Sequence, residues 1–208
     1  MSLLPIQPPV PFRPTIWVAA TGARAWLIIA CLVVAIFIAT ETRLSGAEEP
    51  SFSEYKVKAA FIFNFAKYVE WPPAAFSNAT SPIIVGVGAD SPLYSELESL
   101  VRERHVAGRS LIVRTCENSI DAKAVHILFL DTASEERFAP LLHEGGNPGI
   151  LTVGDSQNFT ENGGIIGFVE QTSKLRFKIN LKEAERAHLK VSSQLLKLAV
   201  VVERKDAS

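Results

Sequence analysis

The chain has 208 residues, of which 48% are hydrophobic and 21% are charged, and its formal net charge is −1. This length is sufficient for one well-buried domain and short for two. Basic residues form no cluster interleaved with aromatic residues, which excludes the usual electrostatic footprint of a nucleic-acid-binding protein. We therefore expect a single domain without a nucleic-acid partner.

The N-terminal segment has the pattern of an export signal. A proline-rich leader and Arg24 precede the uninterrupted apolar run Ala25–Ala39. This run is shorter than the roughly 20 residues needed to cross a bilayer, and the small residues that end at Ala47 suit a signal peptidase. We predict a signal peptide over residues 1–47 and an exported periplasmic domain over residues 48–208. The alternative is an uncleaved N-terminal membrane anchor.

A helix is predicted over Lys56–Pro73, and apolar side chains cover most of its circumference. Glu54 precedes Lys58 by four residues, a spacing that allows an ion pair. One interpretation is an ordinary core helix packed between a sheet and a neighbouring helix. The other is that part of its aromatic surface binds another protein, for which the candidate residues are Phe61, Phe63, Phe65, Tyr68 and Trp71.

Strand and helix patterns alternate along the rest of the chain. Six apolar, β-branched segments predict strands, at residues 82–90, 108–116, 124–131, 149–154, 165–169 and 175–180. Ser91-Pro92 is a helix start signal, and further helices are predicted over residues 134–144, 181–190 and 194–203. The pattern predicts one three-layer α/β domain with a mostly parallel sheet of about six strands. We expect an antiparallel hairpin at its edge and about five flanking helices.

No segment carries a convincing catalytic or metal-binding motif. The run at residues 85–91, VGVGADS, resembles a dinucleotide-binding fingerprint but lacks its third glycine. The four histidines are scattered and show no zinc-ligand spacing. Helix capping accounts for the pairs Asp90-Ser91 and Asp155-Ser156 without a nucleophile. We expect no enzymatic activity, no metal and no cofactor.

The chain has two cysteines, and one of them, Cys31, lies in the predicted leader. Cys116 is then alone in the exported domain and has no partner for an intramolecular disulfide. Two interpretations stay open for it, a buried apolar filler and an intermolecular bridge.

Four polar residues lie within otherwise apolar patterns: Lys58 and Asn64 on the first helix, and Arg176 and Lys178 on the last predicted strand. Alternating cations on one strand face can receive an anion or a partner, because Arg offers a planar fork to carboxylate and phosphate oxygens. The alternative is an exposed edge strand that its charges protect from aggregation.

Five segments in order resemble the YfiR-like family of exported regulators, over about Tyr55–Val202. These segments are residues 55–72, 105–113, 126–131, 150–169 and 175–199. The resemblance implies a periplasmic α/β protein, often a homodimer, that acts by binding. In the best-known branch, the family member binds the periplasmic part of an inner-membrane diguanylate cyclase and represses synthesis of cyclic di-GMP, a signal for biofilm formation.

The resemblance also suggests where binding takes place. Arg176 and Lys178 fall in a matching segment and are expected to line a ligand or partner groove, with Lys58 and Asn64 beside them. One branch of the family uses cysteine pairs as disulfides, whereas only Cys116 is available here, so we do not expect a disulfide switch. The alternative function is a periplasmic module that binds or senses a small molecule without a cyclase partner.

Overall fold

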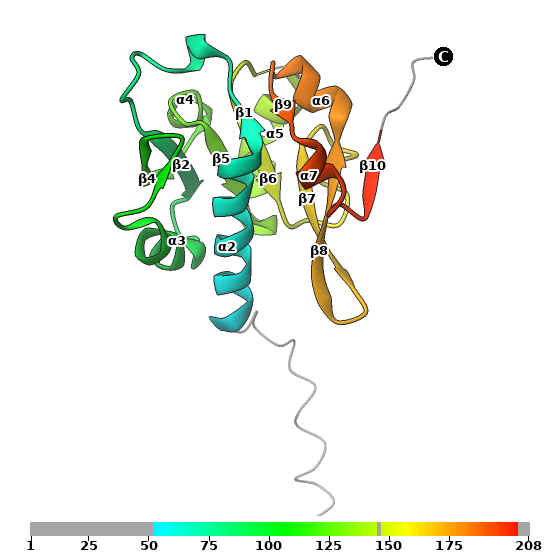
Figure 1. Ribbon diagram of the computed structural model, residues 1–208. Coiled ribbons are helices and arrows are strands. Elements are labelled where there is room, and N and C mark those ends of the chain that lie inside the picture. The colour runs from blue at the N-terminus through cyan, green and yellow to red at the C-terminus, as the bar shows by residue number, and fades with distance from the viewer. Residues whose placement is uncertain (1–51, 145–146, 204–208) are drawn as a thin grey trace, which may run out of the picture. The chain divides into compact units, whose positions relative to one another are not determined.

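The computed structural model describes residues 52–144 and 147–203 (Figure 1), and the predicted signal peptide lies outside these ranges. Within them no helix combines the length and the apolar character needed to span a membrane. The described helices are α2 (Phe52–Tyr68), α3 (Leu93–Val101), α4 (Ser119–Ala122), α5 (Thr132–Glu144), α6 (Leu181–Arg186), α7 (Ser193–Leu196) and the 3₁₀ helix η1 (Pro73–Ala75).

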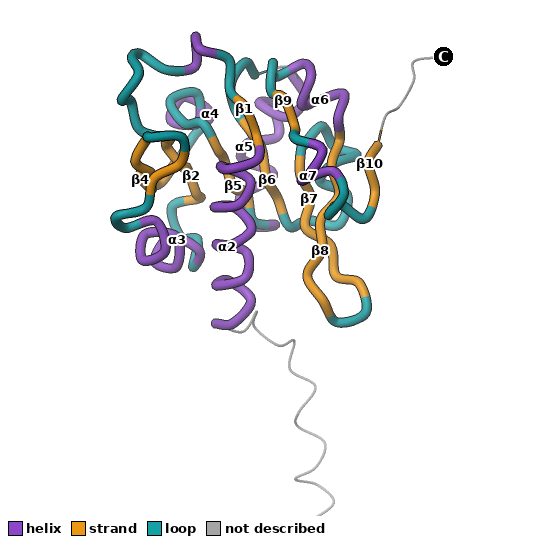
Figure 2. Tube along the Cα trace, viewed as in Figure 1, coloured by secondary structure: helices purple, strands orange, loops and turns teal. Residues whose placement is uncertain are grey.

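The strands form one large sheet and one small one (Figure 2). The large sheet has eight strands in the order β10-β8-β7-β6-β5-β2-β4-β3, and β1 pairs with β9 separately. Strands β4, β2, β5, β6 and β7 are parallel to one another, whereas β8 is antiparallel to β7 and β3 is antiparallel to β4. The strands are β1 (Val69–Glu70), β2 (Ile83–Gly88), β3 (His105–Val106), β4 (Arg109–Cys116), β5 (Ile127–Leu130), β6 (Leu151–Gly154), β7 (Ile166–Gln171), β8 (Lys174–Asn180), β9 (Lys190–Val191) and β10 (Val201–Glu203).

The predicted α/β class and mostly parallel sheet are confirmed, including all six predicted strands. Strand β5 shows why the sheet has helices on both faces, since all four of its residues are buried. Ile127 and Phe129 pack into the cluster that includes residues of α2 and α3, whereas Leu128 and Leu130 pack into the cluster that includes residues of α4 and α5. Successive side chains of a strand point to opposite faces, so an uninterrupted apolar run produces this three-layer arrangement.

The order of the strands contains a reversal at β2. From β2 the chain passes through α3 to β4 on one side, then crosses through α4 to β5 on the other side of β2. In open parallel sheets, ligands bind at the carboxyl ends of the strands that flank such a reversal. In this chain those ends are Gly88 of β2 and Leu130 of β5.

The prediction of a helix over residues 194–203 was wrong beyond Leu196. Helix α7 ends there, and β10 instead pairs in parallel with β8, with Val202 opposite Ile179. Consecutive valines favour an extended backbone because a β-branched side chain packs well on a pleated surface. As a result β10 covers the free side of β8, and the predicted hairpin is one strand away from the edge of the sheet.

The first helix ends earlier than its prolines predicted. Helix α2 stops at Tyr68, and Val69 pairs with Val191 in the small sheet. The backbone N–H of Ser192 donates to the carbonyl oxygen of Tyr68 at 3.0 Å, which satisfies a group at the helix end. The small sheet therefore links the end of α2 to the C-terminal part of the chain.

Candidate functional site

Lys58, the first predicted binding cation, is buried inside an ion-pair network. Its ammonium Nζ lies 2.7 Å from Oε1 of Glu54 and 2.9 Å from Oδ2 of Asp155, and its side chain is only 4% exposed. Asp155 also accepts a hydrogen bond from the backbone N–H of Thr132, the first residue of α5, at 3.0 Å. The predicted ion pair with Glu54 is present, and Asp155 is an additional partner that the sequence did not indicate.

The protonation of Lys58 follows from these partners. Burial lowers the pKa of the ammonium, but the hydrogen bonds and charges of Glu54 and Asp155 outweigh that effect, so the pKa of Lys58 is raised. The ammonium is thus charged and already compensated by two carboxylates. Its charge therefore does not require an anionic ligand for compensation.

Lys178, the second predicted cation, also pairs with a carboxylate of this chain. Its Nζ lies 3.1 Å from Oε1 of Glu161. Burial raises the pKa of Glu161, but hydrogen bonds from its own backbone N–H, Lys178 and Thr160 outweigh it and lower that pKa overall. Asp155 and Glu161 both belong to the segment between β6 and β7, so Lys58 and Lys178 anchor the same segment at two points.

Within the described ranges, no hydrogen bond or ion pair joins Arg176 or Asn64 to those lysines. Arg176 is exposed on β8, two residues before Lys178, and faces Val169 across the β7–β8 pair. Asn64 is half-buried on α2. The four predicted polar residues therefore do not share one groove lined by free charges, and of the three cations only Arg176 is exposed and free of an ion pair in the described part of the chain.

Two of the five predicted interface aromatics lie in an internal ring cluster. Phe65 is fully buried, and its ring centroid lies 5.1 Å from that of Phe177 and 6.0 Å from that of Phe168. Phe61 also contacts Phe177, at 5.6 Å between centroids. Edge and tilted arrangements of this kind add to the stability gained from burial. Packing of α2 on the sheet accounts for Phe61 and Phe65.

Trp71 connects the segment after α2 to the sheet through hydrogen bonds. Its indole N–H lies 3.0 Å from the carbonyl oxygen of Gly149 and 3.3 Å from that of His126. These carbonyls precede β6 and β5, so the indole bridges the ends of two neighbouring strands. Trp71 therefore has a structural role.

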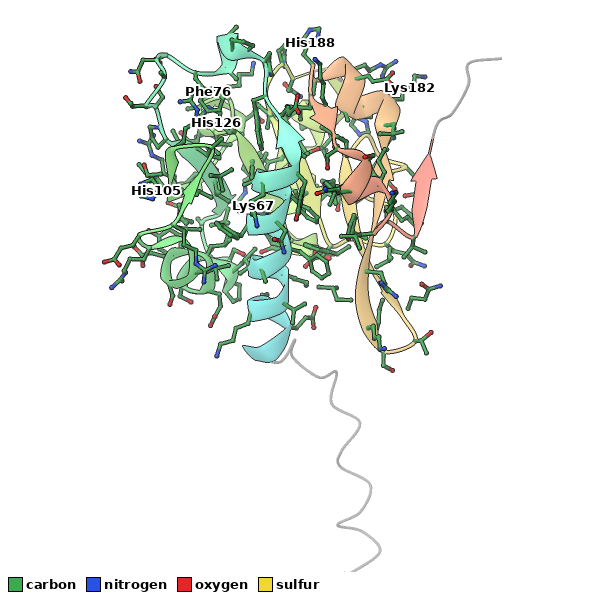
Figure 3. The ribbon with its side chains drawn as sticks, viewed as in Figure 1. Lys67, Phe76, His105, His126, Lys182 and His188 are labelled. Carbon is green, nitrogen blue, oxygen red and sulfur yellow. The ribbon has the colours of Figure 1, made fainter. Side chains whose placement is uncertain are left out.

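Phe63 and Tyr68 remain partly exposed on the outer side of α2, with the exposed Lys67 between them (Figure 3 labels Lys67). The ammonium of Lys67 lies 6.0 Å from the ring centroid of Phe63 and 5.7 Å from that of Tyr68. The guanidinium of Arg104 lies 5.1 Å from the Phe63 ring. We call Phe63, Lys67 and Tyr68 the outer aromatic patch. Both rings also pack in part against the core cluster, so the patch consists of the surface that remains exposed.

The histidines do not form a metal site. His105, His126 and His188 lie at separate positions on the domain (Figure 3), and residues 52–144 and 147–203 contain no group of three His, Cys, Asp or Glu side chains arranged for a metal ion. His126 is buried, with Nδ1 3.0 Å from the backbone N–H of Ile84 and Nε2 3.0 Å from the carbonyl oxygen of Ala75. Both of its ring nitrogens are used in holding the fold.

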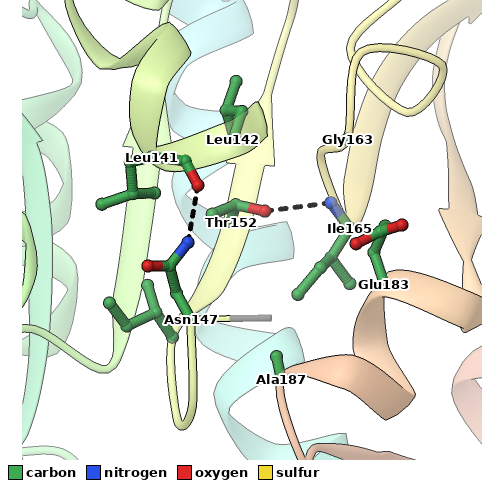
Figure 4. A pocket seen from close by; sticks show the side chains of 9 residues that line it. Leu141, Leu142, Asn147, Thr152, Gly163, Ile165, Glu183 and Ala187 are labelled. Atoms are coloured by element: carbon green, nitrogen blue, oxygen red, sulfur yellow. Dashed lines mark hydrogen bonds between the residues drawn. The ribbon is translucent and has the colours of Figure 1, made fainter. Parts of the chain in front are cut away.

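One pocket is too small for a ligand (Figure 4). Its volume is about 10 Å³, which is room for roughly one water molecule. Beside it, Asn147 donates to the carbonyl oxygen of Leu141 at 2.6 Å, and the hydroxyl of Thr152 accepts from the backbone N–H of Ile165 at 2.9 Å. These bonds satisfy a carbonyl oxygen in the last turn of α5 and the backbone N–H just before β7.

A larger cavity lies at the strand reversal. Its volume is about 100 Å³, and it is lined by Gly88, Ala89, Asp90, Ser91, Asp131, Ala133, Ser134 and Arg137. Ser91 is 6% exposed, and its hydroxyl oxygen is buried without a hydrogen-bond partner. The predicted side-chain cap by Ser91 is therefore not made, and the residue preceding α3 is Pro92.

Asp131 makes the cap on the other side of this cavity. Its Oδ1 accepts from the backbone N–H of Ser134 at 2.9 Å and from the Ser134 hydroxyl at 2.6 Å, at the start of α5. The sequence does not predict this cavity, because each segment at its rim has the pattern of a separate helix start. The signal that could have found it is the position of Asp90-Ser91 and Asp131 directly after the two strands that flank the reversal.

Comparison with protein families gives one match. Residues 55–200 match the family model described as YfiR/HmsC-like. Comparison with curated proteins gives no match.

Solved structures show weaker similarity. The ABC domain from Streptococcus pneumoniae in complex with L-Trp has a TM-score of 0.42 and 14% identity, covering 62% of this chain and 58% of that one. A conserved domain protein from Vibrio cholerae O1 biovar El Tor has a TM-score of 0.42 and 13% identity, covering 72% of this chain and 60% of that one. This chain thus spans less than two thirds of the length of either, and neither TM-score is high enough to establish a common fold.

Proposed function

This chain belongs to the YfiR/HmsC-like family, and from that premise we propose that it binds and represses a membrane-anchored diguanylate cyclase. Members of this family are periplasmic proteins that regulate cyclic di-GMP signalling, and they are regulatory rather than catalytic. In our proposal the exported domain contacts the periplasmic part of the cyclase and limits cyclic di-GMP production. The family match over residues 55–200 is the observation that carries this proposal.

The outer aromatic patch is the surface that we propose for the cyclase or for a second copy of this chain. Aromatic side chains are enriched at binding hot spots, because they bury a large area at a small entropic cost. Phe63 and Tyr68 are partly exposed, and Lys67 lies near both rings. Phe61 and Phe65, in contrast, contact Phe168 and Phe177 within the domain.

Arg176 provides a second candidate contact. It lies on the β7–β8 hairpin, whose turn residues Thr172 and Ser173 have φ of 53° and 55°, the backbone of a tight type I′ turn. Figure 1 shows this hairpin extending beyond the rest of the sheet. An exposed guanidinium on such a projection can reach a carboxylate of a partner.

The test is deletion of the gene followed by measurement of cellular cyclic di-GMP. Repression predicts that the level rises on deletion and returns to normal with the wild-type gene. The double variant F63A/Y68A is expected to leave the level high although the protein accumulates normally. The control is I120A, which removes a side chain that is 80% exposed on α4, and it should restore repression. An unchanged level in the deletion strain would contradict the proposal.

A second candidate is a periplasmic module that senses a small molecule without a cyclase partner. The cavity of about 100 Å³ at the strand reversal favours it, because its lining includes a buried hydroxyl without a partner. Deletion of the gene distinguishes the two functions, because loss of a sensor without a cyclase partner leaves the cellular level of cyclic di-GMP unchanged.

A further inference from the structure

We propose that the cavity at the strand reversal binds a small carboxylate that carries hydrogen-bond donors of its own. The cavity lies between the loops that follow β2 and β5, at the carboxyl ends of the two strands that flank the change in strand order. That crevice is where open α/β sheets hold their ligands, since loops diverge there to opposite faces of the sheet. The proposal requires no cyclase partner and stands independently of the repression proposed above.

Ser91 is the observation that points to a ligand. The side chain is more than nine-tenths buried, lines the cavity, and has no partner for its hydroxyl oxygen. A buried hydroxyl loses its hydrogen bonds to water and normally finds a replacement in the protein. Here a ligand oxygen in the cavity provides that replacement. Gly88 keeps the two rims close, because a Cβ at that position would lie 3.2 Å from Cβ and Oγ of Ser134.

The other lining groups favour an acid on one side of the ligand and donors on the other. Ala133 is in the first turn of the 13-residue helix α5, where the helix dipole attracts anions. The N–H groups of its neighbours Thr132 and Ser134 are already bonded to carboxylates of this chain. Arg137, one turn further along α5, adds a guanidinium suited to a carboxylate. Asp90 and Asp131 are acceptors, and only Oδ1 of Asp131 is used by the Ser134 cap. A plain anion would leave these acceptors unmatched, whereas a hydroxyl or ammonium group on the ligand satisfies them.

The volume of the cavity suits a ligand of a few non-hydrogen atoms. About 100 Å³ is several times the roughly 10–15 Å³ that one water molecule needs. Glycolate and glycine have a suitable size, and each combines a carboxylate with one donor group. They share the proposed chemistry and differ in whether the donor is a hydroxyl or an ammonium.

Thermal unfolding of the protein expressed from its full-length gene tests the proposal. Four probes are compared at millimolar concentration: glycolate, glycine, acetate and ethanolamine. We expect glycolate or glycine to raise Tm by about 2–4 °C, because a ligand that binds only the folded state stabilises it by mass action. Acetate lacks the donor and ethanolamine lacks the acid, so neither should match that shift. An equal shift with either of them, or no shift with any probe, would overturn the proposal.

Ser91→Ala separates a ligand-binding role from a structural one. Removing a buried hydroxyl that has no partner should leave the ligand-free Tm unchanged or higher, while the shift with the effective probe is lost. Arg137→Gln should weaken binding of the same probe at least tenfold, because it removes the guanidinium that pairs with the carboxylate. It should leave the fold intact, because Arg137 is exposed. Ser110→Ala, at an exposed position on β4, is the control and should keep the full shift. A Ser91→Ala protein that still responds, or that unfolds earlier without ligand, would rule out the assigned site.

Discussion

The ammonium of Lys58 lies 2.9 Å from the carboxylate of Asp155, although 97 positions separate the two residues in the chain. The other oxygen of Asp155 accepts from the backbone N–H of Thr132 at 3.0 Å. One carboxylate thus joins helix α2, the segment after β6 and the first residue of α5. Both side chains are largely shielded from water, with exposures of 4% for Lys58 and 17% for Asp155.

Replacing Lys58 by Met should destabilise the protein by about 3–5 kcal/mol. The substitution leaves the Asp155 carboxylate buried without its cation, and an uncompensated buried charge is costly. The measurement is the free energy of unfolding in urea at neutral pH. Lys123→Met, at an exposed position, is the matched control and should change stability by less than about 0.5 kcal/mol.

A double replacement distinguishes the charge effect from lost packing. Lys58→Met combined with Asp155→Asn removes both charges of the pair, so it should recover part of the stability lost in Lys58→Met. If the losses of stability in Lys58→Met and Asp155→Asn simply added in the double variant, the ion pair would not be the source of the effect.

Phe63 and Phe65 should respond differently to Ala substitution although they lie two residues apart on α2. Phe65 is fully buried, so Phe65→Ala should lose about 3–5 kcal/mol of stability. Phe63 is half-buried, and Phe63→Ala should lose clearly less. Our proposal assigns its main effect to oligomeric state or to repression, which size-exclusion chromatography with light scattering and a cyclic di-GMP assay measure. If Phe63→Ala lost as much stability as Phe65→Ala with no change in binding, the outer aromatic patch would be ordinary core surface.

The sequence alone predicts most of this fold because the buried strands carry strong local signals. Strand β5 is a short run of large apolar residues, and the alternation of Leu175, Phe177 and Ile179 identifies the half-buried strand β8. Strand β10 was missed because its few valines have no periodicity that separates a strand from the end of a helix. Its pairing with β8 depends on a neighbour 23 residues away along the chain, as in Val201 opposite Lys178, and a local pattern does not contain that information.

The candidate sites were harder to predict because they depend on which distant residues meet. The spacing of Glu54 and Lys58 gave their ion pair, but nothing near Lys58 in the sequence indicates Asp155. Similarly, Lys178 has the pattern of an exposed strand cation until the β6–β7 segment brings Glu161 to it. The cavity at Ser91 required the strand order, since only the order shows which two loops face each other.

Cys116 should be unreactive in the folded protein. It is 1% exposed, and burial, with a smaller contribution from the nearby Asp121, raises the pKa of its thiol to about 11. The thiolate is the reactive form, so at neutral pH very little of it is present. Modification by iodoacetamide, followed by mass spectrometry, should be slow in buffer and rapid in denaturant. Fast labelling of the native protein, or a disulfide-linked dimer at Cys116 in non-reducing gels, would contradict this assignment.

His126 should make the stability of the domain depend on pH. Its ring nitrogens face the Ile84 N–H and the Ala75 carbonyl, which requires a neutral ring with the proton on Nε2. The ring of His126 also stacks on the ring of Phe76, at 4.6 Å between centroids. The guanidinium of Arg109 lies 3.7 Å from the centroid of the same Phe76 ring. Burial is the main cause that lowers the pKa of His126 below its usual value of 6.5, and the charge of Arg109 acts in the same direction.

The sign of the pH effect follows from this lowered pKa. The contribution of neutral His126 is fully present above pH 6.5, where the unfolded chain is also neutral, and it is lost as the pH falls through the folded pKa, because the unfolded chain binds a proton first. Between the two pKa values the free energy of unfolding should fall by up to about 1.36 kcal/mol per pH unit. Urea unfolding of His126→Asn should remove this part of the pH dependence, since Asn keeps an acceptor for the Ile84 N–H but does not titrate. His105→Asn, at an exposed position on β3, should keep it. An identical pH profile for His126→Asn and the wild type would show that another group is responsible.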